Sequence, residues 1–347
     1  MSSSNAIASD LPSAPRNPAG PAPLRRPNSV RRTSSIDMTW PEGYGGRMHF
    51  ACTGRDIFTR ATGDQPLVLR VDTLKAEIGP DRSIVSIASE PPRAHIGKLV
   101  GARGGGYLRQ ALDEILPDER DAGSPLYLLI DDLSGTSLIA GWAWSRWTPD
   151  WLPKDMVGSN DDTDVRELRR ARMENVCIGF RTGSSALDDM RGESQNSWPV
   201  EPLPNPEDSI GWHELKYHTD TSMRRARRID VWLDDVVHID ATFQDSASLP
   251  TGGRAAIHEY KLQATADPKT LQLLSVVADP RILPYRECPS AAGNVALMVG
   301  TSLREMRTEV LATLRRSLGC THLNDALRAL AEVPILLDDL KKQTATR

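Results

Sequence analysis

The chain has 347 residues, of which 25% are charged and 39% hydrophobic, and its formal net charge is −4. This length allows two domains with cores of their own, and the small negative charge gives no general electrostatic reason to expect nucleic acid or a membrane as partner. Four cysteines are too few for a disulfide framework, so we expect a reducing, cytoplasmic setting.

Residues 1–30 have the composition of a solvated tail. They are rich in Ser, Pro, Ala and Asn, and they carry three arginines, with Arg31 and Arg32 directly after them, against one acid, Asp10. Such a composition buries too little apolar surface to fold. The segment also lacks the apolar stretch of a secretory signal, so we predict a disordered tail.

Residues 31–141 are dense in strand signals. Segments 34–40, 47–60, 67–76 and 83–89 have β-type composition and are separated by turn residues. A helix is predicted at 107–116, and an apolar strand or helix at 126–130. We therefore expect a first α+β unit over 31–141.

Residues 142–222 form a distinct insert. Four of the eight tryptophans fall within Trp142 to Trp151, and a helix is predicted at 165–175. In the stretch CIGFRTGSSAL, Arg181, Ser184 and Ser185 are candidates for binding a phosphate or carboxylate, because small residues let backbone N–H groups approach an anion. The alternative is an ordered turn beneath the tryptophan cluster.

Residues 223–337 repeat the order of the first unit, and residues 338–347 form a C-terminal tail. Strands are predicted at 227–233, 236–244, 257–266 and 271–277, with helices after them. HFACTGRD from His49 recurs as HIDATFQD from His238, and other short matches follow in the same order. We interpret this as an internal duplication. Features present in both units then indicate scaffold, and features present in one unit indicate function.

Three helices with clear end signals follow the last strand. Pro289 places Cys288 at the N-cap of a helix to about Val299. Ser302 and Glu305 form a capping box for a second helix that ends at Gly319. Cys320 precedes the third helix. Unpaired N–H groups and the helix dipole favour negative charge at such positions, so both thiols are expected to ionise more readily.

These residues predict a site in the second unit. His258, Cys288 and Cys320 are the candidate metal ligands, a mixed N/S set that suits Zn or Fe. His322 or Asp279 would act as general base or orient a ligand, and Arg281 would hold a substrate anion together with the Arg181–Ser185 loop. The alternative is that the cysteines are small buried hydrophobes and that the histidines cap helices or pair with carboxylates, with no metal or other cofactor.

The second unit resembles an uncharacterised bacterial family, domain of unknown function 2889, through RRARRIDVW, IHEYKLQATADP, ADPRILPYRECPSA and GCTHLND. The order of strands, helices and cysteines is also similar to that of IscU- and SufE-type iron–sulfur assembly proteins. That resemblance implies a small antiparallel sheet packed against helices, with Cys288 and Cys320 as sulfur ligands.

The sequence therefore predicts an α+β fold of two related halves, each an antiparallel meander packed against helices, joined by the Trp-rich insert. The function expected first is an enzyme of small-molecule catabolism, of lyase or hydrolase type, with a metal or thiolate site in the second half. The alternatives are a metal or iron–sulfur carrier, and a metal-free structural or interaction protein. The oligomeric state stays open.

Overall fold

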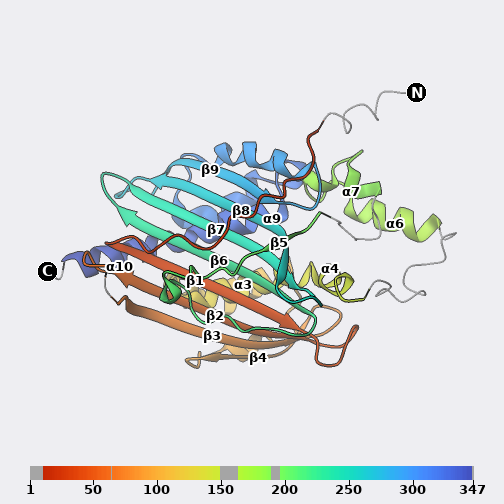
Figure 1. The fold of residues 1–347 in the computed structure, drawn as a ribbon, viewed down its shortest axis with the longest axis horizontal. Helices are drawn as coiled ribbons and strands as arrows, with labels where there is room; N and C mark the ends of the chain where they lie inside the picture. Colours follow the sequence, from red (N-terminus) through yellow and green to blue (C-terminus); the bar gives the residue numbers. More distant parts are fainter. Residues whose placement is uncertain (1–10, 64, 149–162, 189–195, 346–347) are drawn as a thin grey trace.

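The computed structural model describes residues 11–63, 65–148, 163–188 and 196–345. It combines helices with one nine-stranded antiparallel sheet (Figure 1), which confirms the predicted α+β class. Among the described residues, no helix is both long enough and apolar enough to cross a bilayer. Trp151, the last residue of the predicted tryptophan cluster, lies outside the described ranges.

Each half contributes a four-stranded meander to the sheet. The strand order is β4-β3-β2-β1-β6-β7-β8, and β8 pairs at its outer edge with both β5 and β9. The strands are β1 (Ser29–Thr39), β2 (Met48–Thr59), β3 (Leu67–Ile78), β4 (Ile84–Glu90), β5 (Trp198–Val200), β6 (Ser222–Leu233), β7 (Val237–Ser248), β8 (Arg254–Ala266) and β9 (Leu273–Ile282).

The two halves meet where β1 pairs with β6. Ile36 lies opposite Arg225, and Arg32 lies opposite Ile229. On both strands an isoleucine thus faces an arginine of the partner strand. The halves therefore share one continuous sheet rather than forming two separate domains. The matching strand order agrees with a duplication, but common ancestry of the halves remains a prediction.

Helices α3, α9 and α10 lie behind the sheet in the view of Figure 1. The α-helices are α1 (Gly106–Ile115), α2 (Pro117–Asp121), α3 (Pro125–Ser137), α4 (Ala140–Ser145), α6 (Thr163–Met173), α7 (Ser185–Asp188), α8 (Met306–Thr313), α9 (Thr321–Arg328) and α10 (Val333–Ala345). The 3-10 segments are η1 (Ile96–Leu99), η2 (Ile178–Phe180), η3 (Ser209–Gly211), η4 (Cys288–Met298), η5 (Leu303–Glu305), η6 (Arg316–Leu318) and η7 (Ala329–Glu332).

Two of the three predicted C-terminal helices differ in form. The segment from Cys288 is a 3-10 helix, and Cys288 is its first residue rather than its N-cap. The helix after Ser302 ends at Thr313 instead of continuing to Gly319. There the Asn324 side chain donates a hydrogen bond to the Leu314 carbonyl, 2.8 Å away, and this bond takes over a carbonyl that the next helical turn would have used.

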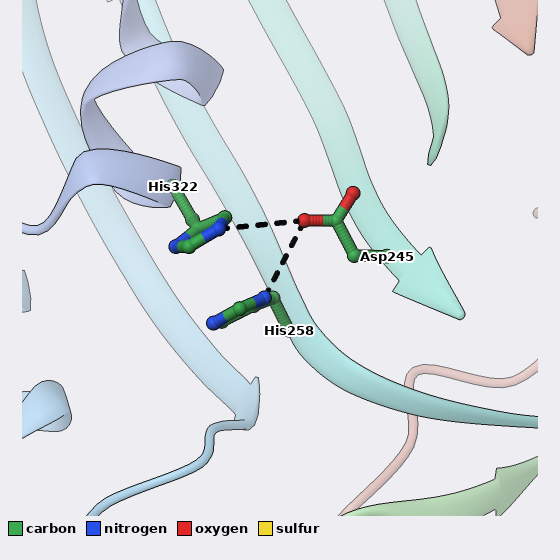
Figure 2. Close-up of side chains that lie close together, drawn as sticks. All are labelled: Asp245, His258 and His322. Atoms are coloured by element: carbon green, nitrogen blue, oxygen red, sulfur yellow. Dashed lines mark ion pairs between the residues drawn. The ribbon is translucent and has the colours of Figure 1, made fainter. Parts of the chain in front are cut away.

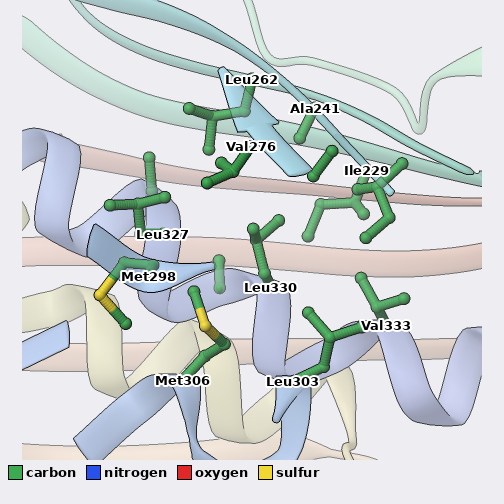
Figure 3. Packing of buried hydrophobic residues seen from close by; sticks show 14 of the residues in the cluster. Ile229, Ala241, Leu262, Val276, Met298, Leu303, Met306, Leu327, Leu330 and Val333 are labelled. Atoms are coloured by element: carbon green, nitrogen blue, oxygen red, sulfur yellow. The ribbon is translucent and has the colours of Figure 1, made fainter. Parts of the chain in front are cut away.

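Apolar residues of the sheet pack against the helices in two clusters, one made mainly by each half. In the second half, Ile229, Leu262 and Val276 point from the strands toward helical residues such as Met298 and Leu330 (Figure 3). Period-two alternation puts these strand residues on the helix-covered face. The other face is called the front face below, since it faces the viewer in Figure 1.

A layer of buried ion pairs separates the two apolar clusters. Arg32 and Arg225 are each 1% exposed. Arg32 binds Asp56 through two hydrogen bonds, and Arg225 binds Asp245 in the same way. The helices supply further carboxylates to this layer: Asp131 and Asp132 on α3, Asp325 on α9, Glu332 in η7 and Asp339 on α10. Each buried charge is thereby paired, which burial requires.

Two segments without long helices lie on the front face: residues 11–28 cover the second half, and residues 201–221 cover the junction of β1 and β6. Residues 11–28, which the composition assigned to a solvated tail, run across this face (Figure 1). Ala22 N–H donates to the Leu203 carbonyl, and Arg25 pairs with Asp208. His213 belongs to the second segment. The hydroxyls of Thr33 and Ser35 lie 2.9 and 2.7 Å from its two ring nitrogens.

Replacing Arg225 by Met should destabilise the protein by about 3–5 kcal/mol, because three buried carboxylates lose their shared guanidinium. Urea unfolding measures the change. Arg120→Met is the matched control: Arg120 is paired with Asp113 and Asp121 at the surface, so its loss should cost about 1 kcal/mol or less. Equal effects of the two substitutions would contradict the role given to the buried layer.

The stability should also fall in mild acid because of His213. Burial lowers the pKa of His213 to about 3, whereas the unfolded side chain takes up a proton near pH ~6.5. The unfolded state therefore binds more protons between these values, so stability present above the unfolded pKa decreases as the pH falls. His213→Gln keeps a hydrogen-bonding side chain that does not titrate. Between pH ~7 and ~4.5, the free energy of unfolding of this variant should fall by about 2–3 kcal/mol less than that of the wild type. Identical pH profiles would refute this assignment.

Candidate metal site

Three side chains with metal-ligating atoms meet on the helix-covered face of the second half. Asp245 on β7 lies opposite His258 on β8, at a β-bulge where Ile257 is the extra residue. His322 comes from the first turn of α9 and points to the same carboxylate (Figure 2). The bulge matters because it brings His258 beside Asp245 while Ile257 still reaches the other apolar cluster.

The donor atoms of the three residues are close together and buried. Asp245 Oδ2 is 3.4 Å from His258 Nδ1 and 3.7 Å from His322 Nε2, and all three donor atoms lie within 4.8 Å of one another. The two imidazole rings are stacked, with centroids 3.4 Å apart and planes 16° apart. Neither nitrogen has a hydrogen-bond partner among the described residues. Unpaired polar atoms in a core call for an explanation.

Burial and charge set the protonation of this group. Burial lowers the pKa of His258, which the Asp245 carboxylate only partly offsets. Burial and then the neighbouring His258 hold the pKa of His322 well below its usual value. Burial alone would raise the pKa of Asp245, but the Arg225 guanidinium brings it below the ordinary range. The site therefore presents two neutral imidazoles and one carboxylate, which are the protonation states that bind metal.

The donor set fits a small divalent ion. Zinc binds imidazole nitrogen and carboxylate oxygen at about 2.0–2.2 Å, so tetrahedral ligand atoms lie roughly 3.3–3.6 Å apart. The two measured donor separations are close to this range. An imidazole binds metal in its ring plane, so loading requires the stacked rings to turn apart. Asp245 would stay oriented by Arg225, whose two nitrogens lie 2.9 and 3.0 Å from its oxygens.

The cysteines predicted as ligands lie near this group without belonging to it. Among the described residues, the set of donors within 4.8 Å of one another comprises Asp245, His258 and His322. Cys288 and Cys320 are buried, and both lie close to the buried Tyr260 on β8, two residues beyond His258. The structure thus brings His322 into the position that the sequence analysis gave to a cysteine sulfur.

The prediction that these thiols ionise readily is wrong for the structure as described. Burial raises the pKa of Cys288 well above its usual value, and the nearby Cys320 and Cys177 thiols raise it further. Burial likewise raises the pKa of Cys320, although the N–H groups of Leu323 and His322 oppose the shift. The helix-start effect is therefore present at Cys320, but desolvation is larger.

The sequence did not single out Cys177, yet the structure places it with the other two cysteines. A Cβ added to Gly179 would lie 2.9 Å from Cys288 Sγ and 3.7 Å from Cys177 Sγ. Glycine at 179 therefore lets η4 approach the turn that carries Cys177. Three of the four cysteines converge, while Cys52 lies in the apolar cluster of the first half.

Asp279, a predicted general base, and Arg281, predicted to bind substrate, do not join the histidines. Asp279 pairs with Arg281 near the end of β9, and it lies opposite Lys261, whose side chain points to the front face. Asp279 and His258 are therefore on different faces of the sheet. Neither Asp279 nor Arg281 reaches the metal ligands.

The predicted anion-binding loop does hold an anion, but one from the chain itself. The Glu287 carboxylate accepts hydrogen bonds from Ser185 N–H and from the Ser185 hydroxyl, at 2.9 and 2.8 Å. Ser184 is buried, and Arg181 is half-buried beside it. The loop thus fixes η4, which begins one residue after Glu287.

Asp245 is the ligand that sequence reasoning missed. It ends the motif HIDATFQD and matches Asp56 in the first half, and both aspartates pair with an arginine. A feature present in both halves indicated scaffold. Asp245 is scaffold through Arg225, and it faces two histidines as well, a combination that Asp56 lacks.

Comparison with known protein families gives a match in the second half of the chain. Residues 223–336 match the model of the family described as protein of unknown function (DUF2889), as the sequence motifs predicted. No curated protein and no solved structure matches the chain. The family match contains Asp245, His258 and His322, and it leaves Cys177 outside.

The buried thiols should react slowly with a disulfide reagent in the folded protein. Burial raises the pKa of the half-buried Cys177 thiol to about 11, so little thiolate exists near neutral pH. Mass-spectrometric mapping of labelled sites should show Cys177 labelled before Cys288 and Cys320, because it alone of the three is not fully buried. Rapid labelling of Cys288 or Cys320 in folded protein would contradict this order.

Proposed function

We propose that this protein binds one divalent transition-metal ion, with Zn²⁺ as the best fit, through Asp245, His258 and His322. The observation that carries the proposal is the pair of imidazole nitrogens that face one carboxylate oxygen without a hydrogen-bond partner. A buried histidine normally uses its ring nitrogens. Here His258 Nδ1 and His322 Nε2 both lie near Asp245 Oδ2 without a hydrogen bond to any described residue. These three atoms could together bind one ion.

The surroundings of the ligands favour a structural or carrier role for the ion. Asp245 is fully buried and His258 is 5% exposed. The three ligands come from β7, β8 and α9, so an ion among them would tie the sheet to the helix layer. Binding free energy then adds to folding free energy, because the unfolded chain has no preformed site.

An enzyme of lyase or hydrolase type is the second candidate function. It is favoured by the number of ligands, since three protein ligands leave a position for water or substrate, as in catalytic zinc sites. The ion would there supply Lewis-acid chemistry. The chain's own contribution would be the low-dielectric surroundings and the fixed orientation of Asp245 by Arg225.

Metal content and thermal stability test the proposal. Protein stripped with a chelator should take up about one Zn²⁺ per chain, and excess Zn²⁺ at ~100 times its Kd should stabilise it by about 2.7 kcal/mol. His258→Gln and His322→Gln should each abolish the uptake and the shift of Tm. His95→Gln is the control, because His95 is exposed in the first half.

The outcomes separate the roles. The site would be refuted if Zn²⁺ did not raise the Tm of the wild-type protein. It would also be refuted if Zn²⁺ raised the Tm of the His322→Gln variant as much as that of the wild type. Where Co²⁺ replaces Zn²⁺, a visible spectrum that changes on addition of azide would indicate an open position and support the enzyme. A spectrum insensitive to azide would support a closed structural or carrier site.

A further inference from the structure

A shallow hollow of about 350 Å³ lies on the front face of the first half, away from the metal ligands. Phe50 and Ala76 belong to the apolar cluster behind the sheet, so their neighbours His49, Lys75 and Glu77 point to the front. Small side chains leave the space: Ala51 and Ala88 flank Lys75 in the same cross-strand row. A volume of this order suits a small molecule.

The corresponding place in the second half shows what the hollow can hold. There, Trp232 on β6 lies opposite His238 on β7, and the two rings are stacked with centroids 4.9 Å apart and planes 4° apart. The Arg26 guanidinium lies over the Trp232 ring, 4.8 Å from its centroid. An indole ring, a histidine and a cation thus meet on the front face.

In the first half the histidine is kept and the indole is missing. Thr39 lies opposite His49 where Trp232 lies opposite His238. The smaller side chain leaves the hollow, which Thr39 and His49 both line. His49 Nε2 is buried and has no hydrogen-bond partner among the described residues. A bound ring that stacks on His49 would take the place that Trp232 has beside His238.

The charges around the hollow favour an anion. Lys75 is exposed, and among the described residues no carboxylate pairs with its ammonium group. Glu77 is the acidic residue of the lining, and Arg47 already neutralises it, at 3.0 Å. The lining therefore carries an unbalanced positive charge at Lys75, beside a hydroxyl donor at Ser86.

We propose that this hollow binds a small planar aromatic carboxylate, with its ring stacked on His49 in the place that Trp232 fills in the other half. Its carboxylate pairs with Lys75. The ring gains by stacking, and the ammonium–carboxylate pair adds a charge-assisted hydrogen bond. The proposal does not depend on the metal site, which lies in the other half and on the other face.

Ligand-observed NMR with benzoate tests the assignment on the full-length protein. Benzoate should bind, whereas its neutral analogue benzamide and its non-aromatic analogue cyclohexanecarboxylate should bind at least about tenfold more weakly, a loss of ~1.4 kcal/mol each. Lys75→Gln should weaken benzoate by about tenfold as well. Thr39→Trp should abolish binding, because the indole would fill the hollow as Trp232 does.

Lys98→Gln is the matched control, since Lys98 is an exposed lysine of the same half that does not line the hollow; it should leave benzoate binding unchanged. Absence of benzoate binding to the wild-type protein would overturn the proposal. So would equal affinities in Lys75→Gln, Thr39→Trp and wild type. Circular dichroism of each variant verifies that the fold is retained before the affinities are compared.

Discussion

The need to pair buried guanidinium groups at the β1–β6 junction constrains most of the structure. Arg32 and Arg225 sit in the middle of a sheet that would otherwise have an unbroken apolar face. A buried, unpaired charge would cost several kcal/mol, so the packed helices must supply carboxylates at fixed places. Carboxylates on α3, α9, η7 and α10 reach this layer. Helices that met only apolar residues could shift by a turn at little cost; helices that must complete ion pairs cannot.

The candidate metal site lies at the edge of this layer and depends on it. Arg225 binds both oxygens of Asp245, and this contact fixes the carboxylate while leaving Oδ2 facing His258 and His322. Asp325, about one turn along α9 from the helix start, binds the same guanidinium and so holds the helix that carries His322. Arg225 therefore positions two of the three candidate ligands. The third ligand, His258, is positioned by the bulge in β8.

The sequence predicted the elements well and the contacts between them poorly. Alternating β-type segments and cap residues indicated the strands and the helix starts, because these signals act locally. The arginines of RRARRIDVW carry no local sign that they are buried, since charged residues are mostly exposed. Part of their pairing depends on carboxylates far away in the chain, such as Asp325 for Arg225, 100 residues away. For the same reason Cys177 could not be placed beside Cys288: only the packing of η2 against η4 brings them together.

The two halves share strand register but differ in how each face is completed. Behind the sheet, Asp56 and Asp245 occupy matching positions, yet Asp56 meets Arg70 and Arg32 whereas Asp245 meets Arg225 and two histidines. On the front face, residues 11–28 cover the second half, residues 201–221 cover the junction of β1 and β6, and Trp232 lies on the second half. The first half keeps Thr39 and an open hollow at the matching place. A shared scaffold therefore leaves one metal-ligand set and one open hollow, on opposite faces and in opposite halves. Because the ion pairs at β1–β6 tie the sheet to the helices in both halves, the scaffold does not depend on the residues that differ between them.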